Sequence, residues 1–223
     1  MLTNAALYKL QTWLSPSYPV GAYAFSHGIE NAVETSLVNN ASDVTDWVAT
    51  IIGSGNGYAD LVFLAAAWDA TTDNTELADV IELAHAFQTT AELRTESVAQ
   101  GTAFLSATRH AWPCTELDLL TGDVPIIYPV AVGVAAAGHD IDRKLALQAY
   151  GHAFVANLVS AAIRLIPLGQ SDGQQTLATL EPAVNAAVAR AAEMPLARVA
   201  TSTLMVDITS MNHETQYTRL FRS

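Results

Sequence analysis

Three neighbouring residues, Ser26, His27 and Glu30, are of the types that form a hydrolytic site. Ser26 and Glu30 would lie one turn apart on a helix, but adjacent serine and histidine side chains point about 100° apart and do not face each other. Ser26 also does not stand in the G-x-S-x-G pattern of a nucleophile elbow, because residue 24 is alanine. We therefore favour capping and surface roles for these residues. A helical enzyme that uses Ser26, His27 and Glu30 is the less favoured alternative.

A second group consists of two carboxylates, Glu92 and Glu96, in the stretch AELRTES. Their spacing of four residues places them on one face of a helix, with Arg94 on a different face. Two such carboxylates repel each other unless a cation or a hydrogen-bond donor lies between them. We expect them to pair with an arginine in the interior or across an interface, and regard general acid–base catalysis as a weaker interpretation.

Metal and nucleotide sites are not indicated. Cys114 is the single cysteine, and the two closest of the six histidines, His139 and His152, are 13 residues apart. The stretch IIGSGNGYAD lacks the G-x-G-x-x-G spacing and the Walker lysine of a phosphate loop. We predict no metal, cofactor or catalytic residue. A metal site assembled across a subunit interface, with His27 or His213 as a ligand, stays open.

The composition fits a soluble globular protein. Hydrophobic residues make up 51% of the 223 residues, and the formal net charge is -12. An acidic chain without a basic cluster is a poor nucleic-acid binder. The apolar windows are shorter than the roughly 20 residues of a membrane span, and the N-terminus does not look like a signal peptide. With one cysteine, these features indicate a cytoplasmic protein.

The apolar periodicity predicts an all-α, single-domain helical bundle over residues 1–223, with about eight to ten helices and a C-terminal extension from about residue 196. Gly101 is expected at a kink or a close contact, and "RVATSTLMV" is the one stretch that reads as extended. The segment from Leu196 onward shows no strong period. Helices are expected over residues 4–14 and 26–34, from a cap at Ser42 to the glycines after residue 52, over 59–68 and 75–112, from a cap at Asp140 or Asp142 to Arg164, and over 175–193. Residues 124–138 are expected to form a compact, proline-bounded segment closed by Gly138 as a C′ residue.

Four ordered stretches carry a resemblance to a known family: WLSPSYPVGAYAFSHGIENAVE, AELRTESVAQG, NLVSAAIRLIPLGQSDGQ and HETQYTRLFRS. On these motifs the sequence resembles the UreF family of urease accessory proteins over nearly its full length. Phe154 stands where the family commonly has tryptophan. Arg164 stands where many members have lysine, so a role specific to lysine does not carry over.

The resemblance implies an all-helical homodimer without catalytic chemistry of its own. It implies a scaffold that bridges a second accessory protein, UreD (UreH in some species), and the GTPase UreG on apo-urease, so that nickel is inserted with GTP hydrolysis. Modulation of the UreG GTPase is part of this expectation. A UreF-like adaptor for a different metalloenzyme is the alternative.

The last seven residues contain two arginines, a tyrosine and a phenylalanine, although the chain has only ten basic residues. Large aromatic groups and arginines are typical interface anchors. The alternative is that Leu220 and Phe221 fold back onto their own subunit, with Arg219 paired to a local carboxylate. With the resemblance, the residues expected to bind partners are His213, Glu214, Gln216, Tyr217, Arg219, Leu220, Phe221 and Arg222 in the C-terminal segment, and Tyr23, His27, Glu30 and Arg164 elsewhere.

Overall fold

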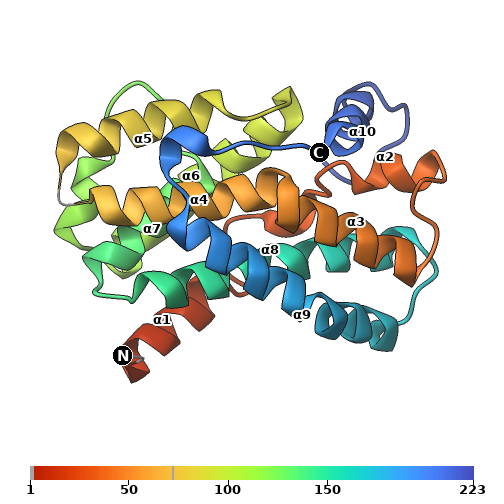
Figure 1. The fold of residues 1–223 in the computed structure, drawn as a ribbon, viewed down its shortest axis with the longest axis horizontal. Coiled ribbons are helices and arrows are strands. Elements are labelled where there is room, and N and C mark those ends of the chain that lie inside the picture. The colour runs from red at the N-terminus through yellow and green to blue at the C-terminus, as the bar shows by residue number, and fades with distance from the viewer. Residues whose placement is uncertain (1–2, 72) are drawn as a thin grey trace.

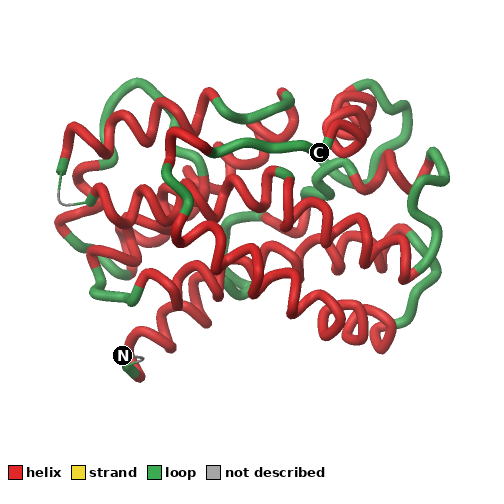
Figure 2. The backbone as a smooth tube through the Cα atoms, in the orientation of Figure 1, coloured by secondary structure: helices red, strands yellow, loops and turns green. Residues whose placement is uncertain are grey.

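The protein is built from packed α-helices (Figures 1 and 2). The computed structural model describes residues 3–71 and 73–223, and these residues contain no β-strand. The all-α fold class predicted from the sequence is therefore confirmed. The helices are α1 (Asn4–Trp13), α2 (Ile29–Glu34), α3 (Ala41–Ser54), α4 (Asn56–Ala70), α5 (Asn74–Ala86), α6 (Ala91–Ala111), α7 (Tyr128–Gly138), α8 (Arg143–Leu165), α9 (Gln170–Glu193) and α10 (Leu204–Glu214), with 3-10 turns at Ala22–Ala24, Thr115–Leu119 and Leu196–Arg198.

The centre of the bundle is formed by α4 and α7. Both helices are buried on nearly all sides, α4 from Asn56 to Ala65 and α7 from Pro129 to Ala136. A helix that is apolar all round belongs in the interior of a domain, because it has no face suited to water. Helix α4 contacts α3, α5, α7, α8 and α9, so it is the element around which the others pack.

One helical stretch, Ala41–Ala70, is long and apolar enough to cross a membrane when judged by length and composition alone. It comprises α3 and α4, and 78% of its most apolar window is buried inside the protein. Such burial is expected of a core helix in a helical bundle.

A smaller unit of the fold lies at one end of the bundle, where α2 and α10 pack side by side (Figure 1). Helix α10 also contacts α6, and α2 contacts α8. Residues far apart in the sequence, near positions 30, 95 and 215, are thus brought together at this corner.

Several predicted helix boundaries are wrong. The expected helix over 75–112 is two helices, α5 and α6, because Thr90 acts as an N-cap and accepts a hydrogen bond from the Leu93 N–H. The cap of α3 is Asn40 rather than Ser42, since the Asn40 side chain accepts from the amides of residues 42 and 43. The expectation for Gly101 is confirmed as a close contact, because a Cβ there would lie 2.2 Å from the Ile126 carbonyl oxygen.

Three further differences concern chain ends and corners. The expected helix over 26–34 begins only at Ile29, because His27 and Gly28 both have positive φ. Helix α9 begins five residues before the expected Gln175, where the Asp172 carboxylate accepts from the Gly169 N–H. The structure also contains α10, which the sequence analysis missed. The stretch RVATSTLMV, expected to be extended, becomes helical from Leu204.

Candidate functional site

The last nine residues, 215–223, run back over their own chain, and we call them the tail. Its end lies along residues 24–26. The Arg222 N–H donates to the Ala24 carbonyl oxygen at 2.8 Å, and the Ser26 N–H donates to the main-chain oxygen of Ser223 at 2.6 Å. The Ser26 hydroxyl donates to the same oxygen at 2.7 Å. Main-chain hydrogen bonds of this kind fix the position of the segment irrespective of its side chains.

Glu30, in the first turn of α2, receives the tail. Its Oε1 accepts from the Leu220 N–H at 2.6 Å, and its Oε2 accepts from the Phe221 N–H at 2.9 Å. The side chain is buried, so these charge-assisted hydrogen bonds are shielded from water. The start of α2 is fixed against α10, because a Cβ at Gly28 would lie 2.9 Å from the Ser210 nitrogen.

His213, the fully buried histidine at the end of α10, lies between two carboxylates. Its Nε2 is 2.9 Å from Oε2 of Glu30, and its Nδ1 is 2.8 Å from Oε2 of Glu92. Each ring nitrogen of His213 thus contacts one of the two carboxylates. His213 thereby joins the three helices α2, α6 and α10 at one point.

Glu92 and Glu96 on α6 complete a set of buried acids that, with Glu30, we call the carboxylate receptor. Glu92 pairs with Arg219 of the tail at 3.1 Å, which confirms that an arginine of the same chain approaches this acid. Burial raises the pKa of Glu92, while the nearby His213 and Arg219 oppose that shift. Glu96 accepts from the Ser223 hydroxyl at 2.9 Å and from the Gln100 amide at 3.2 Å.

Phe221 is the apolar anchor of the tail. Its side chain is 4% exposed, and the Arg164 guanidinium carbon lies 4.4 Å from the centre of its ring. Arg164 also donates from Nε to the Ser160 carbonyl oxygen at 3.1 Å, and burial lowers the pKa of Arg164. The arginine and the aromatic ring therefore form a cation–π pair within the chain.

The tail also presents side chains to solvent. Tyr217 is fully exposed, and Leu220 is 65% exposed although its N–H is bound to Glu30. Tyr23, on the 3-10 turn beside the tail, is 68% exposed. The predicted partner-binding residues thus divide into two groups: His213, Phe221, His27 and Glu30 are buried, whereas Glu214, Tyr217, Arg219, Leu220, Arg222, Tyr23 and Arg164 are exposed and Gln216 is half-buried.

Ser26, His27 and Glu30 do not form a catalytic relay. The Ser26 hydroxyl is bound to Ser223, and the Glu30 carboxylate is bound to the tail and to His213. His27 turns the other way, with Nδ1 at 3.5 Å from Oε2 of Glu96. Across residues 3–71 and 73–223 no group of three or more His, Cys, Asp or Glu residues is placed to hold a metal ion.

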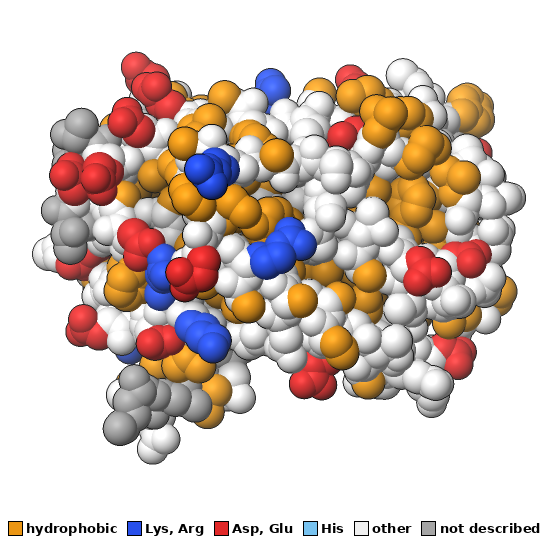
Figure 3. All heavy atoms as spheres, in the orientation of Figure 1, with side chains coloured by type: hydrophobic (Ala, Val, Ile, Leu, Met, Phe, Trp, Pro, Cys, Tyr) orange, Lys and Arg blue, Asp and Glu red, His pale blue; other side chains and the backbone are white. Residues whose placement is uncertain are grey.

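An apolar surface on α10 adjoins the tail and was missed in the sequence analysis. Leu204, Met205 and Met211 are all large and exposed. Leu204, Ile208 and Met211 follow helical spacing, so this signal was present in the sequence. Figure 3 shows hydrophobic side chains gathered over the corner where α2 and α10 lie. Contiguous exposed apolar surface of this kind is typical of protein–protein contact sites.

Fold and site together define an all-helical protein whose C-terminal segment is anchored by buried acids and presents apolar side chains. A sequence model of the UreF family matches residues 38–181, more than half of the chain. The chain is 46% identical to "Urease accessory protein UreF" of Bradyrhizobium diazoefficiens (strain JCM 10833 / BCRC 13528 / IAM 13628 / NBRC 14792 / USDA 110), over 98% of this chain and 92% of the relative. It is 44% identical to the protein of that name from Granulibacter bethesdensis (strain ATCC BAA-1260 / CGDNIH1), over 99% of this chain and 95% of the relative. The chain belongs to the UreF family of urease accessory proteins.

Proposed function

We propose that this chain is a non-enzymatic scaffold of urease maturation that joins UreD (UreH) and the GTPase UreG on apo-urease for GTP-dependent nickel insertion. Membership of a family of urease accessory proteins supports a role in urease maturation. The individual partners, the homodimer, the cytoplasmic location and an effect on the UreG GTPase are the finer parts of the proposal.

The observation that carries the proposal is the anchored tail with Tyr217 and Leu220 exposed on it. A flexible terminus loses conformational entropy when it binds a partner, which weakens the complex. The Glu30 carboxylate removes much of that cost, because it already holds the main chain on both sides of the Leu220 side chain. Large aromatic and aliphatic groups on a fixed backbone are the usual anchors of a protein interface.

The α10 surface extends this docking area. Leu204 and Met211 are exposed on the helix that leads into the tail, so a partner that covers Tyr217 can continue along α10. Between Val199 and Thr218 the sequence has two acids and no lysine or arginine. We therefore expect the UreD-type partner to meet this area with apolar side chains and a basic rim.

The test is co-elution with UreD in size-exclusion chromatography. Truncation of the tail is a poor variant, because it would leave the acids of the carboxylate receptor without their partners. The double variant Tyr217→Ser/Leu220→Ser changes exposed side chains only and keeps every hydrogen bond of the tail backbone. Tyr8→Ser, at an exposed tyrosine on α1, is the matched control.

We expect the double variant to fold normally and to lose UreD, with UreG recruitment lost as a consequence, while Tyr8→Ser binds like the unchanged protein. Removal of such anchors costs about 2 kcal/mol or more, roughly thirtyfold in affinity. Unchanged binding of the double variant would place the docking surface elsewhere. Failure of the unchanged protein to bind UreD at all would favour the adaptor for a different metalloenzyme.

A further inference from the structure

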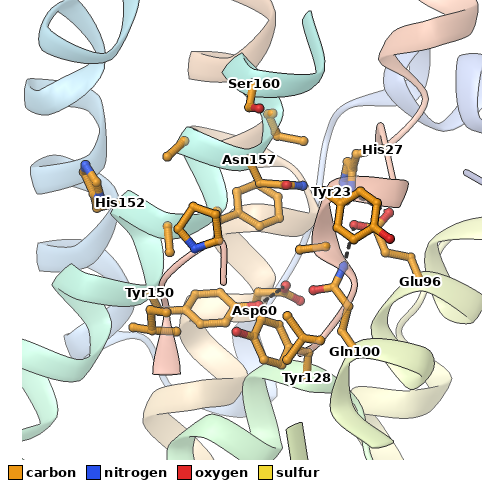
Figure 4. A pocket seen from close by; sticks show the side chains of 18 of the residues that line it. Tyr23, His27, Asp60, Glu96, Gln100, Tyr128, Tyr150, His152, Asn157 and Ser160 are labelled. Carbon is orange, nitrogen blue, oxygen red and sulfur yellow. Dashed lines mark hydrogen bonds and ion pairs between the residues drawn. The ribbon is translucent and has the colours of Figure 1, made fainter. Parts of the chain in front are cut away.

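A cavity of about 380 Å³ is lined by residues that include Glu96, the acid that binds Ser223 of the tail (Figure 4). Its floor is built by His27, Asp60, Glu96 and Tyr150, which come from the loop before α2 and from α4, α6 and α8. Exposed residues at its edge include Tyr23. The floor is therefore buried, while the edge is accessible to solvent.

The charge of the cavity is one-sided. The floor carries two carboxylic acids, Asp60 and Glu96, and none of the described residues that line the cavity is a lysine or an arginine. Asp60 accepts a hydrogen bond from the Tyr150 hydroxyl at 2.7 Å, and Glu96 accepts from Gln100 and Ser223. An acidic floor inside low-dielectric walls attracts positive charge more strongly than an exposed acid does.

Two further polar side chains of the cavity have atoms that make no hydrogen bond within the part of the chain that the structure describes. His27 is 4% exposed, and its Nδ1 lies 3.5 Å from Oε2 of Glu96, but neither ring nitrogen makes a hydrogen bond there. Oδ1 of Asn56, another cavity residue, is also without a donor. Buried polar atoms are nearly always hydrogen-bonded, so the unsatisfied Asn56 oxygen and His27 ring, beside the two acids, mark a place suited to a polar ligand with N–H donors.

Aromatic rings complete the walls. Tyr128 and Tyr150 lie with their ring centres 5.5 Å apart, and Phe154 packs edge-on against His27 at 5.4 Å. Figure 4 shows Tyr23 and Tyr128 on the same cavity as the acids. Aromatic faces combined with a carboxylate are the usual surroundings of an organic cation in proteins, because the ring faces carry negative charge.

We propose that this cavity binds an organic cation, an alkylammonium or guanidinium group, on Asp60 and Glu96 between the tyrosine rings. An organic cation suits the cavity better than a metal ion, since the described residues include no triad of metal-type ligands. The inference concerns a site separate from the partner surface of the tail, and it does not require that surface to bind UreD.

The cavity predicts how binding depends on pH. Burial raises the pKa of Asp60 to about 7; the Tyr150 hydrogen bond and His27 oppose this shift, and the charge of Glu96 adds to it. Tyr128 also faces this acid. A cation favours the ionised acid, so binding displaces a proton and becomes stronger as the pH rises from about 6 to about 8.

Titration calorimetry of the full chain with n-butylammonium and with n-propylguanidinium tests the proposal, with uncharged n-butanol as the control ligand. The variant Asp60→Asn keeps an acceptor for the Tyr150 hydroxyl and removes the charge. Asp79→Asn, at an exposed acid on α5, removes the same charge elsewhere. We expect saturable binding of a cation but not of butanol, weakened about tenfold or more by Asp60→Asn and unchanged by Asp79→Asn.

Two results would overturn the proposal. One is the absence of saturable binding by either cation. The other is equal binding to the protein and to Asp60→Asn, which would mean diffuse attraction to a chain of net charge -12.

If the cavity binds these cations, competition between them and the protein partners identifies the source of the natural cation. If n-propylguanidinium or n-butylammonium displaces UreD or UreG from the chain, and Asp60→Asn weakens the same complex, the natural group is a side chain of that partner. If the complex is insensitive to both, the group belongs to a free small molecule. Loss of UreD binding in Tyr217→Ser/Leu220→Ser is a separate measurement, so either proposal can fail without the other.

Discussion

The substitution Glu30→Gln tests how the tail is held. The Glu30 carboxylate accepts three hydrogen bonds, from the amides of Leu220 and Phe221 and from Nε2 of His213. Glutamine has one acceptor oxygen, and its NH₂ group would face a donor. At least one of the three bonds is therefore lost and the charge is removed from the others.

The expected magnitude follows from those contacts. A hydrogen bond to a charged group is worth about 1.5–3 kcal/mol, and a buried donor left without an acceptor adds its own desolvation cost. We expect anchoring of the tail to weaken by about 2–4 kcal/mol, which corresponds to roughly thirtyfold to several-hundredfold faster exchange if the tail opens on its own.

The assay is amide hydrogen exchange, read at Leu220 and Phe221. Glu34→Gln, an exposed acid on the same helix, is the matched control and should leave exchange unchanged. Amides of α4 in the core report on global stability and should change less than the tail amides. The reasoning would be refuted if Leu220 and Phe221 exchanged at the same rate in Glu30→Gln as in the unchanged protein.

Three further predictions concern the core and the anchor of the tail. Asp60 has its pKa raised from 3.8 to about 7, so its contribution to stability is present below pH 3.8 and is lost as the pH rises through about 7. At 1.36 kcal/mol per pKa unit this loss is roughly 4 kcal/mol. Urea unfolding should therefore show Asp60→Asn gaining stability relative to the unchanged protein between about pH 4 and pH 8. A difference in unfolding free energy between the two proteins that does not change with pH would contradict this. Gly101→Ala should destabilise the protein by about 2 kcal/mol or more, because the new Cβ would lie 2.2 Å from the Ile126 carbonyl oxygen. Gly53→Ala, with open space around its Cβ, is the control and should not destabilise it. Equal melting temperatures of the two variants would show that the backbone around Gly101 can move to make room. Arg164→Gln removes the cation over the Phe221 ring, which should weaken anchoring of the tail by about 0.5–1 kcal/mol. Carboxypeptidase should then trim the tail faster. An unaltered trimming rate would mean that other contacts hold the ring.

The sequence was sufficient for the fold class, because alanine-rich apolar periodicity and proline positions are local signals. It failed at boundaries where one side chain decides, as at the Thr90 cap that separates α5 from α6. It also missed α10, although Leu204, Ile208 and Met211 carry its period, since the adjoining RVATS stretch favours extended backbone.

The candidate site was predicted only in part. The composition of the C-terminal segment predicted burial against a partner, with folding back onto its own subunit as the alternative, and the pair Glu92 and Glu96 indicated a cation nearby. That the cation is Arg219, and that Glu30 holds amides 190 and 191 positions away, depends on packing of α2 against α10. Periodicity carries no information on such distant contacts. The prediction that Phe221 and Arg219 bind partners now competes with their contacts inside the chain, whereas Tyr217 and Leu220 are exposed for a partner.

The most direct test of the account is the affinity of UreD for the protein and for Tyr217→Ser/Leu220→Ser, measured with Tyr8→Ser alongside. Hydrogen exchange of the Phe221 amide in each variant should first show that the tail stays anchored. The account predicts roughly thirtyfold weaker UreD binding for the double variant and unchanged binding for Tyr8→Ser. Equal affinity of all three proteins, with the tail anchored in each, would contradict the claim that the exposed face of the tail is the docking element.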